Sequence, residues 1–278
     1  MRASEAPHTI RLFESLSDFA DFAEGGSYRS KSGDAWAGAT FAEALALTRE
    51  GDLSLVSRSE ALLEKFESTE LLTKRREWIS DIAGVVPSVP AYIAGHPQAM
   101  RRRAKREHEA APVTVYVDLF LSAAFSVEDT AIRGAAVLAF VRVLARFRPV
   151  TLLIGYGTLD RRGRPLCPMV RLNTTPLDLA HAAYAFGSAS IVRRTLLAVL
   201  DRMVPGSSPW PPFRGDYEAL LREVFGSGEQ LVVVKGGMIA GIVKNPTAWI
   251  EARLREAAPE VLGEGPGEAR GEARQERS

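Results

Sequence analysis

Hydrophobic residues in the first third of the chain recur at the spacing of an amphipathic helix. Four of them, at intervals of three, predict a short helix near the N-terminus: Phe13, Leu16, Phe19 and Phe22. Capping boxes, in which a hydroxyl residue precedes a glutamate by three positions, predict further helix starts at Thr40 and Ser57. Helical character is expected as far as Trp78, so the N-terminal part is predicted to be mainly helical.

The pattern changes in the middle of the chain. Residues 113–122 are rich in β-branched and aromatic side chains, and valines alternate with more polar neighbours, which is typical of a strand. Residues 128–147 are apolar nearly all round, as in a helix that is buried on more than one side. Residues 150–154 are continuously apolar, as expected for a strand in a sheet covered on both faces. Together these segments predict a strand–helix–strand core.

The segments that follow continue the alternation of strands and helices. Residues 167–172 are a candidate hairpin partner, and residues 231–234 are a third apolar strand. Between them, a helix is expected to start at Thr175 and Pro176 and to break at residues 187–190. This order predicts an α/β fold with a doubly wound, mostly parallel sheet.

Composition divides the chain into three parts. Residues 1–110 are predicted to form a helical N-terminal extension and residues 111–258 the α/β core. Residues 259–278 form a charged, low-complexity tail that cannot build a core and should be disordered. Residues 84–97 and 206–214 contain several prolines, which favour rigid, extended loops suited to contact with another protein.

Charge and cysteine content narrow the class of protein. The chain has 278 residues and a net charge of +1, so its global charge favours neither a nucleic acid nor an acidic partner. The single cysteine, Cys167, excludes a disulfide framework and a cysteine-based zinc site, and it fits a reducing compartment. No secretory signal and no apolar run of membrane-spanning length is present, which predicts a cytoplasmic protein without membrane contact.

From the first core strand onward, the order of elements resembles the core of a von Willebrand A-like domain. The metal site of such domains uses an Asp-x-Ser-x-Ser run, a loop threonine and a further aspartate, which are oxygen ligands suited to Mg²⁺. Asp118 and Ser122 match the ends of the run, Phe120 stands in place of the middle serine, and Thr175, or Thr174 beside it, is the candidate loop residue. The lost serine predicts poor metal affinity. The alternative is that Asp118 caps a strand end or pairs with an arginine.

Three segments carry a second resemblance. They are WAGATFAEALALTREGD at 36–52, AGVVPSVPAYIAGHPQAMRRR at 83–103 and IRGAAVLAFVRVLARF at 132–147. Together they resemble a family of uncharacterised tailed-bacteriophage proteins. The resemblance implies a phage or prophage origin and a place in the bacterial host cytoplasm or in the virion. That family has no assigned activity, so the resemblance implies no reaction.

One dense basic run follows the first Pro-rich loop: Arg101, Arg102, Arg103, Lys105 and Arg106. Such side chains can neutralise phosphates and give salt-dependent affinity for nucleic acid. The run has no interleaved aromatic residue to stack on bases, and acidic residues follow it at once. The alternatives are a solvated connector, or arginines that pair with acids of the N-terminal helices.

The remaining candidates for chemistry are isolated in the sequence. Arg193 and Arg194 lie near a predicted helix start, where anions can bind, and surface arginines beside an apolar stretch are the alternative. No two histidines have metal-ligand spacing, and His181 is interpreted as a packed or boundary residue. The Gly-rich segments match no dinucleotide, phosphate or nucleophile motif. We therefore predict no catalytic residue, and no cofactor other than Mg²⁺ at Asp118.

These observations favour three hypotheses. The first is a non-enzymatic interaction or assembly protein of phage origin whose partner is a protein, in the simplest case one encoded by the same phage. The second is a nucleic-acid-binding protein or divergent nuclease that uses the run from Arg101 to Arg106 and a carboxylate such as Asp118. The third is Mg²⁺-dependent ligand recognition at Asp118.

Overall fold

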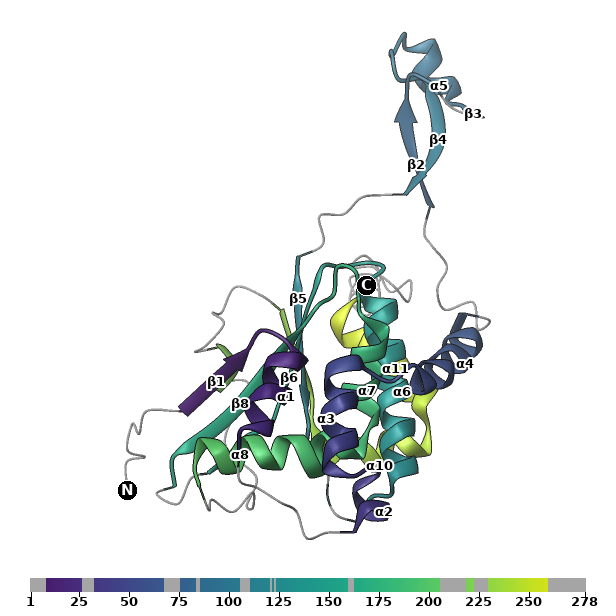
Figure 1. The fold of residues 1–278 in the computed structure, drawn as a ribbon. Coiled ribbons are helices and arrows are strands. Elements are labelled where there is room, and N and C mark those ends of the chain that lie inside the picture. Colours follow the sequence, from purple (N-terminus) through teal and green to yellow (C-terminus); the bar gives the residue numbers. More distant parts are fainter. Residues whose placement is uncertain are drawn as a thin grey trace, which may run out of the picture.

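The protein was analysed as a computed structural model, which describes residues 9–26, 33–67, 76–83, 86–105, 111–120, 122, 124–159, 163–205, 219–222 and 230–259. These residues form a central sheet with helices packed against it, and a separate three-stranded sheet (Figure 1). The predicted mixed α/β fold with a mostly parallel central sheet is confirmed. None of the helices in the described part of the chain is long and apolar enough to cross a membrane.

The central sheet has the strand order β1-β8-β6-β5-β9. β5 pairs in parallel with β6 on one side and with β9 on the other. β8 runs antiparallel to β6, β1 runs parallel to β8, and the short β7 also pairs with β8. The strands are β1 (Thr9–Phe13), β5 (Val113–Asp118), β6 (Val150–Gly155), β7 (Thr158–Leu159), β8 (Pro165–Leu172) and β9 (Gln230–Val234).

Parallel pairing brings the carboxyl ends of three strands to one edge of the sheet. Asp118 at the end of β5 lies opposite Gly155 of β6, and Val117 lies opposite Val234 of β9. The chain leaves β5 towards β6 and later returns to β9 on the other side of β5. The winding therefore reverses between β5 and β9, and Asp118 ends its strand at this reversal, where open α/β sheets usually bind ligands.

One face of the central sheet carries a layer of helices. Val113, Val115 and Val117 of β5 belong to one buried cluster with residues of these helices. α6 lies at the centre of the layer and contacts α4, α7, α10 and α11, which explains why its sequence is apolar nearly all round. The helices of the layer are α1 (Leu16–Glu24), α3 (Phe41–Glu50), α4 (Val56–Glu67), α6 (Val127–Leu144), α7 (Leu179–Gly187), α8 (Leu197–Met203), α10 (Ile239–Lys244) and α11 (Pro246–Ala257).

The opposite face of the sheet has a smaller buried cluster. Side chains from β5, β6 and β8 pack there against the described helical residues Leu220 and Leu221. Cys167 belongs to this cluster, and burial raises the pKa of its thiol to about 12, so the thiol is protonated at neutral pH. The sheet residues of the cluster are Tyr116, Leu153, Cys167 and Met169.

The N-terminal segment differs from the predicted helix. Thr9–Phe13 is a strand, β1, and the helix α1 begins at Leu16 after Ser15, whose side chain accepts the Asp18 N–H. Phe13 packs on Phe19 with ring centroids 5.1 Å apart, so the spacing of three arises at a corner between strand and helix. The N-terminal part therefore adds a strand to the central sheet, while the predicted boundary at residues 110 and 111 stays a prediction.

The small sheet corrects the prediction of helix as far as Trp78. Residues Arg76–Asp81 form β2, which pairs antiparallel with β4 (Met100–Lys105), and β3 (Val86–Pro87) pairs with the start of β4. The basic run is thus a paired strand as far as Lys105 and not a connector. Between β3 and β4, the predicted Pro-rich loop contains a five-residue helix, α5 (Val89–Ile93). Figure 1 shows this small sheet standing apart from the central sheet.

Some predictions fall on residues outside the described ranges. These are the second Pro-rich loop at 206–214, Arg106, and the expected disorder of the tail from residue 260 onward. The predicted helix start at Thr175 and Pro176 is described and is wrong. α7 begins at Leu179, because Asp178 caps it by accepting the His181 N–H.

Candidate functional site

The first candidate site is Asp118, at the point where the winding of the sheet reverses. Its carboxylate accepts the backbone N–H of Phe120 at 3.0 Å and that of Gly236 at 3.2 Å. The side chain is buried, and burial raises its pKa despite these two hydrogen bonds and the nearby charge of Arg133. Asp118 therefore joins the carboxyl end of β5 to the loop that follows β9.

A fully buried arginine approaches the same strand end. Arg133 of α6 is 1% exposed, and its Nη2 donates to the backbone carbonyl of Asp118 at 2.7 Å. Its Nε has no hydrogen-bond partner, and burial lowers the pKa of the guanidinium to about 10. Arg133 thus ties α6 to the strand end through the main chain, while the Asp118 carboxylate is held by backbone amides.

Phe120, the second residue after Asp118, packs against the loops that follow β6 and β9. The ring of Phe120 stacks on Tyr156, with centroids 6.1 Å apart and planes 11° apart. A Cβ atom built on Gly236 would lie 2.2 Å from the Phe120 carbonyl oxygen, so the two loops pack directly on each other. At the position of the middle serine of the metal-site pattern, Phe120 therefore donates its backbone N–H to Asp118, and its side chain stacks on Tyr156.

The structure does not bring the predicted metal ligands together. Ser122 lies in the loop after β5, where its hydroxyl accepts the Ala124 N–H. Thr174 donates to the carbonyl of Val150, at the start of β6, which puts it and its neighbour Thr175 at the opposite edge of the sheet. Five residue-to-residue steps along β6, about 16 Å, separate the two edges. This ligand set does not fit one Mg²⁺ ion, and within the described ranges no three His, Cys, Asp or Glu side chains cluster as metal ligands.

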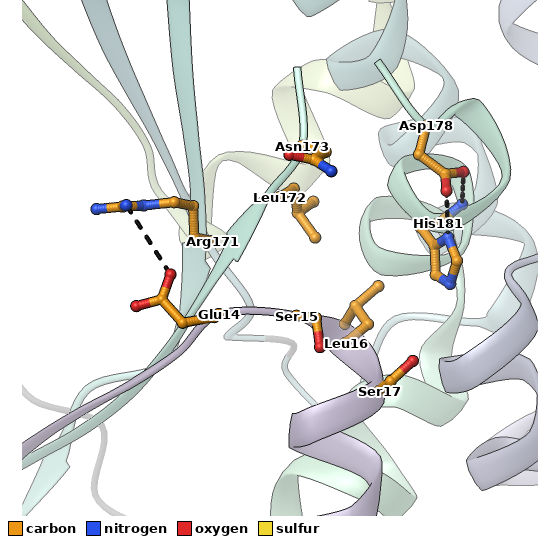
Figure 2. A pocket seen from close by; sticks show the side chains of 9 residues that line it. All are labelled: Glu14, Ser15, Leu16, Ser17, Arg171, Leu172, Asn173, Asp178 and His181. Carbon is orange, nitrogen blue, oxygen red and sulfur yellow. Dashed lines mark hydrogen bonds and ion pairs between the residues drawn. The ribbon is translucent and has the colours of Figure 1, made fainter. Parts of the chain in front are cut away.

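A polar hollow of about 170 Å³ lies between the start of α1, the end of β8 and the start of α7 (Figure 2). Arg171 on one side of it faces Glu14 at 3.9 Å, and His181 with Asp178 forms the other side. Its lining residues are Glu14, Ser15, Leu16, Ser17, Arg171, Leu172, Asn173, Asp178 and His181.

His181 is fully engaged in this hollow. Its Nδ1 lies 2.6 Å from the Asp178 carboxylate and its Nε2 lies 2.8 Å from the backbone carbonyl of Arg49. Each ring nitrogen therefore lies within hydrogen-bond distance of an oxygen of the protein. Burial raises the pKa of Asp178, but its hydrogen bonds with His181 outweigh that effect and hold the pKa below its ordinary value. The histidine fastens α7 to the end of α3 and has no nitrogen left for a ligand.

A second hollow, of about 410 Å³, shares Arg171 with the first. It lies at the amino-terminal edge of β5 and β6. Four threonines line it, together with the amide of Asn173 and the guanidinium of Arg171. Its lining residues include no base that could activate a threonine hydroxyl as a nucleophile. They are Thr114, Thr151, Leu152, Arg171, Leu172, Asn173, Thr174 and Thr175.

Arg193 and Arg194 are buried, which corrects their interpretation as surface arginines. They lie in a π-helical turn, Ile191–Leu196, that directs both side chains inward. Arg193 donates to the carbonyls of Trp36 and Phe125, and its guanidinium lies 4.5 Å from the centroid of the Trp36 ring. Arg194 donates to the carbonyl of Ala39 at 3.0 Å and to the carboxylate of Asp34 at 2.7 Å. The pair anchors residues 34–39 through these contacts, while the Nε of Arg193 is buried without a hydrogen-bond partner.

The small sheet carries two features that the sequence did not link. Five of the seven large hydrophobic side chains that are exposed in the described residues lie between β2 and β4: Ile82, Val86, Val89, Tyr92 and Ile93. The basic run forms β4, where Arg101 is exposed. The Pro-rich composition of 84–97 indicated an exposed contact loop, but no sequence signal indicated the pairing of β2 with β4.

The fold defines a mixed α/β protein with a small accessory sheet. Residues 2–211 match the family model of a domain of unknown function, DUF7192. The chain belongs to this family, which confirms the prediction of an uncharacterised family. No curated protein and no solved structure matches the chain.

Proposed function

We propose that the chain is a non-enzymatic interaction or assembly protein, and that residues 76–105 form its contact surface for a protein partner. We call these residues the projecting unit. The observation that carries the proposal is the apolar tip of this unit, in which Ile82, Tyr92 and Ile93 are 76%, 75% and 79% exposed. Soluble proteins rarely gather large apolar side chains at the surface unless a partner covers them.

The proposal also covers the origin of the protein, its location and the architecture of its core. The segments that resemble tailed-phage proteins support a phage or prophage origin, a partner from the same phage, and a place in the host cytoplasm or the virion. The strand order β8-β6-β5-β9, with β8 as the antiparallel strand, supports an A-like, doubly wound core. In this proposal the core is a scaffold that carries the projecting unit.

The test is a quantitative pull-down from phage-infected or lysogenic cells. The full chain is compared with the double variant Tyr92→Ser and Ile93→Ser, and with Leu53→Ser, which removes an exposed hydrophobic residue outside the projecting unit. We expect a protein that the wild type and Leu53→Ser enrich equally and that the double variant loses about tenfold, as for truncated hot spots. Absence of any reproducible partner, or equal recovery by all three chains, would contradict the proposal.

A second candidate function is nucleic-acid binding by the basic run. The register of β2 and β4 favours it, because it places an aromatic position among the basic positions. The nuclease form of this hypothesis gains no support, since the Asp118 carboxylate is buried and accepts two backbone hydrogen bonds.

A further inference from the structure

The register of β2 and β4 sorts the residues of the projecting unit onto two faces. The strands pair antiparallel over six residues, with Trp78 opposite Arg103 and Arg76 opposite Lys105. Because successive strand positions alternate between the faces of a sheet, opposed residues share a face. One face, which we call the basic face, has the positions Arg76, Trp78, Ser80, Arg101, Arg103 and Lys105. The other has Glu77, Ile79, Asp81, Met100, Arg102 and Ala104.

The two faces differ in charge. The basic face has four cationic positions and no acidic one, whereas the other face has one arginine and two acids. The whole chain has a net charge of only +1, so this concentration of positive charge is local. Along β4 the cations recur at every second residue, about 7 Å apart, and form a row about 14 Å long. Such a row follows a linear polyanion better than it fits a single small anion.

Trp78 occupies a position in the middle of the basic face. It lies directly opposite Arg103, with cationic positions on both sides along the ribbon. Cations that follow a phosphate backbone, together with an aromatic ring on which a base stacks, are the two parts of single-strand recognition. The base faces of a duplex are already stacked, so a tryptophan offers little there. The run of basic residues lacks aromatic residues in sequence, but its partner strand supplies one.

We infer that the basic face is a binding site for single-stranded nucleic acid. The row Arg101, Arg103 and Lys105, with Arg76 beside it, contacts successive phosphates, and Trp78 provides the surface for one base. The site narrows the second candidate function from the whole basic run to the basic face, from which the register excludes Arg102. It does not depend on Tyr92 and Ile93 of the apolar tip, which lie in the segment between β2 and β4. The protein pull-down and the binding assay below can therefore fail independently.

The test measures binding of a labelled oligothymidylate of about 20 nucleotides, longer than the site of a single binding module, to the full chain by fluorescence anisotropy. The matched variants are Arg103→Gln and Arg102→Gln, which remove the same charge from neighbouring positions on opposite faces. We expect Arg103→Gln to weaken binding at least fivefold and to reduce the salt slope by about 0.7, the value for one phosphate contact on a single strand. Arg102→Gln should stay within about twofold of the wild type, with an unchanged slope. Equal loss in both variants, or no binding at low salt, overturns the inference.

Two further arms identify the ligand class. Trp78→Leu should weaken binding of the single strand at least fivefold while Trp78→Phe retains most of it, since base stacking requires an aromatic ring. Circular dichroism of each variant separates loss of the ribbon from loss of the contact. The assignment is overturned if the same sequence binds more tightly as a duplex, or if polyglutamate binds equally tightly at the same salt concentration. Either result would mean that the basic face binds another class of polyanion.

Discussion

At the scale of single residues, two buried ionisable groups lie at the end of β5: the carboxyl group of Asp118 and the guanidinium group of Arg133, which reaches it from α6. Asp118 and Arg133 are both buried, yet no ion pair joins their side chains among the described contacts. The carboxylate accepts backbone N–H groups, and the guanidinium donates to a backbone carbonyl. Each group therefore organises main chain, and each has a pKa shifted by burial towards its neutral form.

The raised pKa of Asp118 predicts an unusual pH dependence of stability. A carboxyl group whose pKa is higher in the folded state stabilises the fold below its unfolded pKa of about 3.9, and this contribution is lost as the pH rises through the folded pKa. Asp118→Asn keeps the shape and removes the titration. We expect the free energy of unfolding of the wild type, minus that of Asp118→Asn, to fall as the pH is raised above about 4. Urea denaturation at several pH values measures this difference.

Asp129 is the control, because its pKa is shifted in the opposite direction to that of Asp118. It is the acidic partner in the capping box of α6, and its hydrogen bonds with Ser126 lower its pKa. Both its folded and unfolded pKa values therefore lie below about 4. The difference between wild type and Asp129→Asn should be constant above about pH 5. A constant difference for Asp118→Asn as well would show that burial does not control the Asp118 carboxyl group.

At the scale of elements, the fold depends on the close crossing of α6 and α7. A Cβ atom built on Gly134 of α6 would lie 2.2 Å from the Cα and 2.4 Å from the amide nitrogen of Gly187. Neither of these backbone atoms can move without moving the helix. Gly134 is therefore required by contact between backbones rather than by its own conformation.

The crossing predicts that Gly134→Ala is destabilising. Alanine favours a helix interior over glycine by up to about 1 kcal/mol, but overpacking against backbone costs about 1–3 kcal/mol and should exceed this gain. Gly241→Ala in α10 is the control, because a Cβ atom added there would meet nothing within 4 Å, and it should be neutral or stabilising by up to about 1 kcal/mol. Denaturant unfolding compares the two. Equal stability of both variants would mean that the helices separate without cost.

Elements that bury a continuous apolar pattern could be predicted from the sequence. β5, α6 and β6 were found because their periodicity is local and their burial is nearly complete. β1 was missed, and its last residue, Phe13, was assigned to the predicted helix, since the pairing of β1 with β8 joins residues more than 150 positions apart and leaves no local signal. β2 and β4 were missed for the same reason, because charged residues have low strand propensity and pairing alone fixes them as strands.

The candidate site could be predicted only in part. The sequence located Asp118 at a strand end, where its chemistry suggested a ligand site. The hairpin predicted at residues 167–172 is present as β8, which runs antiparallel to β6, but the metal-site pattern did not take into account that this strand returns Thr175 to the opposite edge of the sheet. The sequence also could not show that the Gly236 N–H, contributed 118 residues later, binds the Asp118 carboxylate. The edge of the sheet at which a strand ends, and the distant residue that binds a side chain, follow from the topology of the fold and not from local composition.

At the scale of the whole molecule, the described chain combines a large core with a projecting unit. Residues 82–83 and 86–101, the part of the unit whose burial is described, belong to neither of the two buried clusters that define the core. The strands of the projecting unit pair with one another and not with the central sheet. The central sheet is thus complete without the unit, and the unit contains both surfaces that we propose for binding.

This arrangement predicts that the core folds without the projecting unit. Replacing residues 76–105 by a Gly/Ser linker of about eight residues changes the loop-closure entropy by only about 1 kcal/mol, since this term grows with the logarithm of loop length. None of the residues of either buried cluster is removed by this change, as far as the burial of residues 82–83 and 86–101 is described. We expect unchanged cooperative unfolding and a thermal midpoint within about 4 °C of the full chain, measured by circular dichroism. The same variant should bind neither the protein partner nor the oligonucleotide. Loss of cooperative unfolding would show that the unit stabilises the core, and retained binding would place the contact surfaces on the core instead.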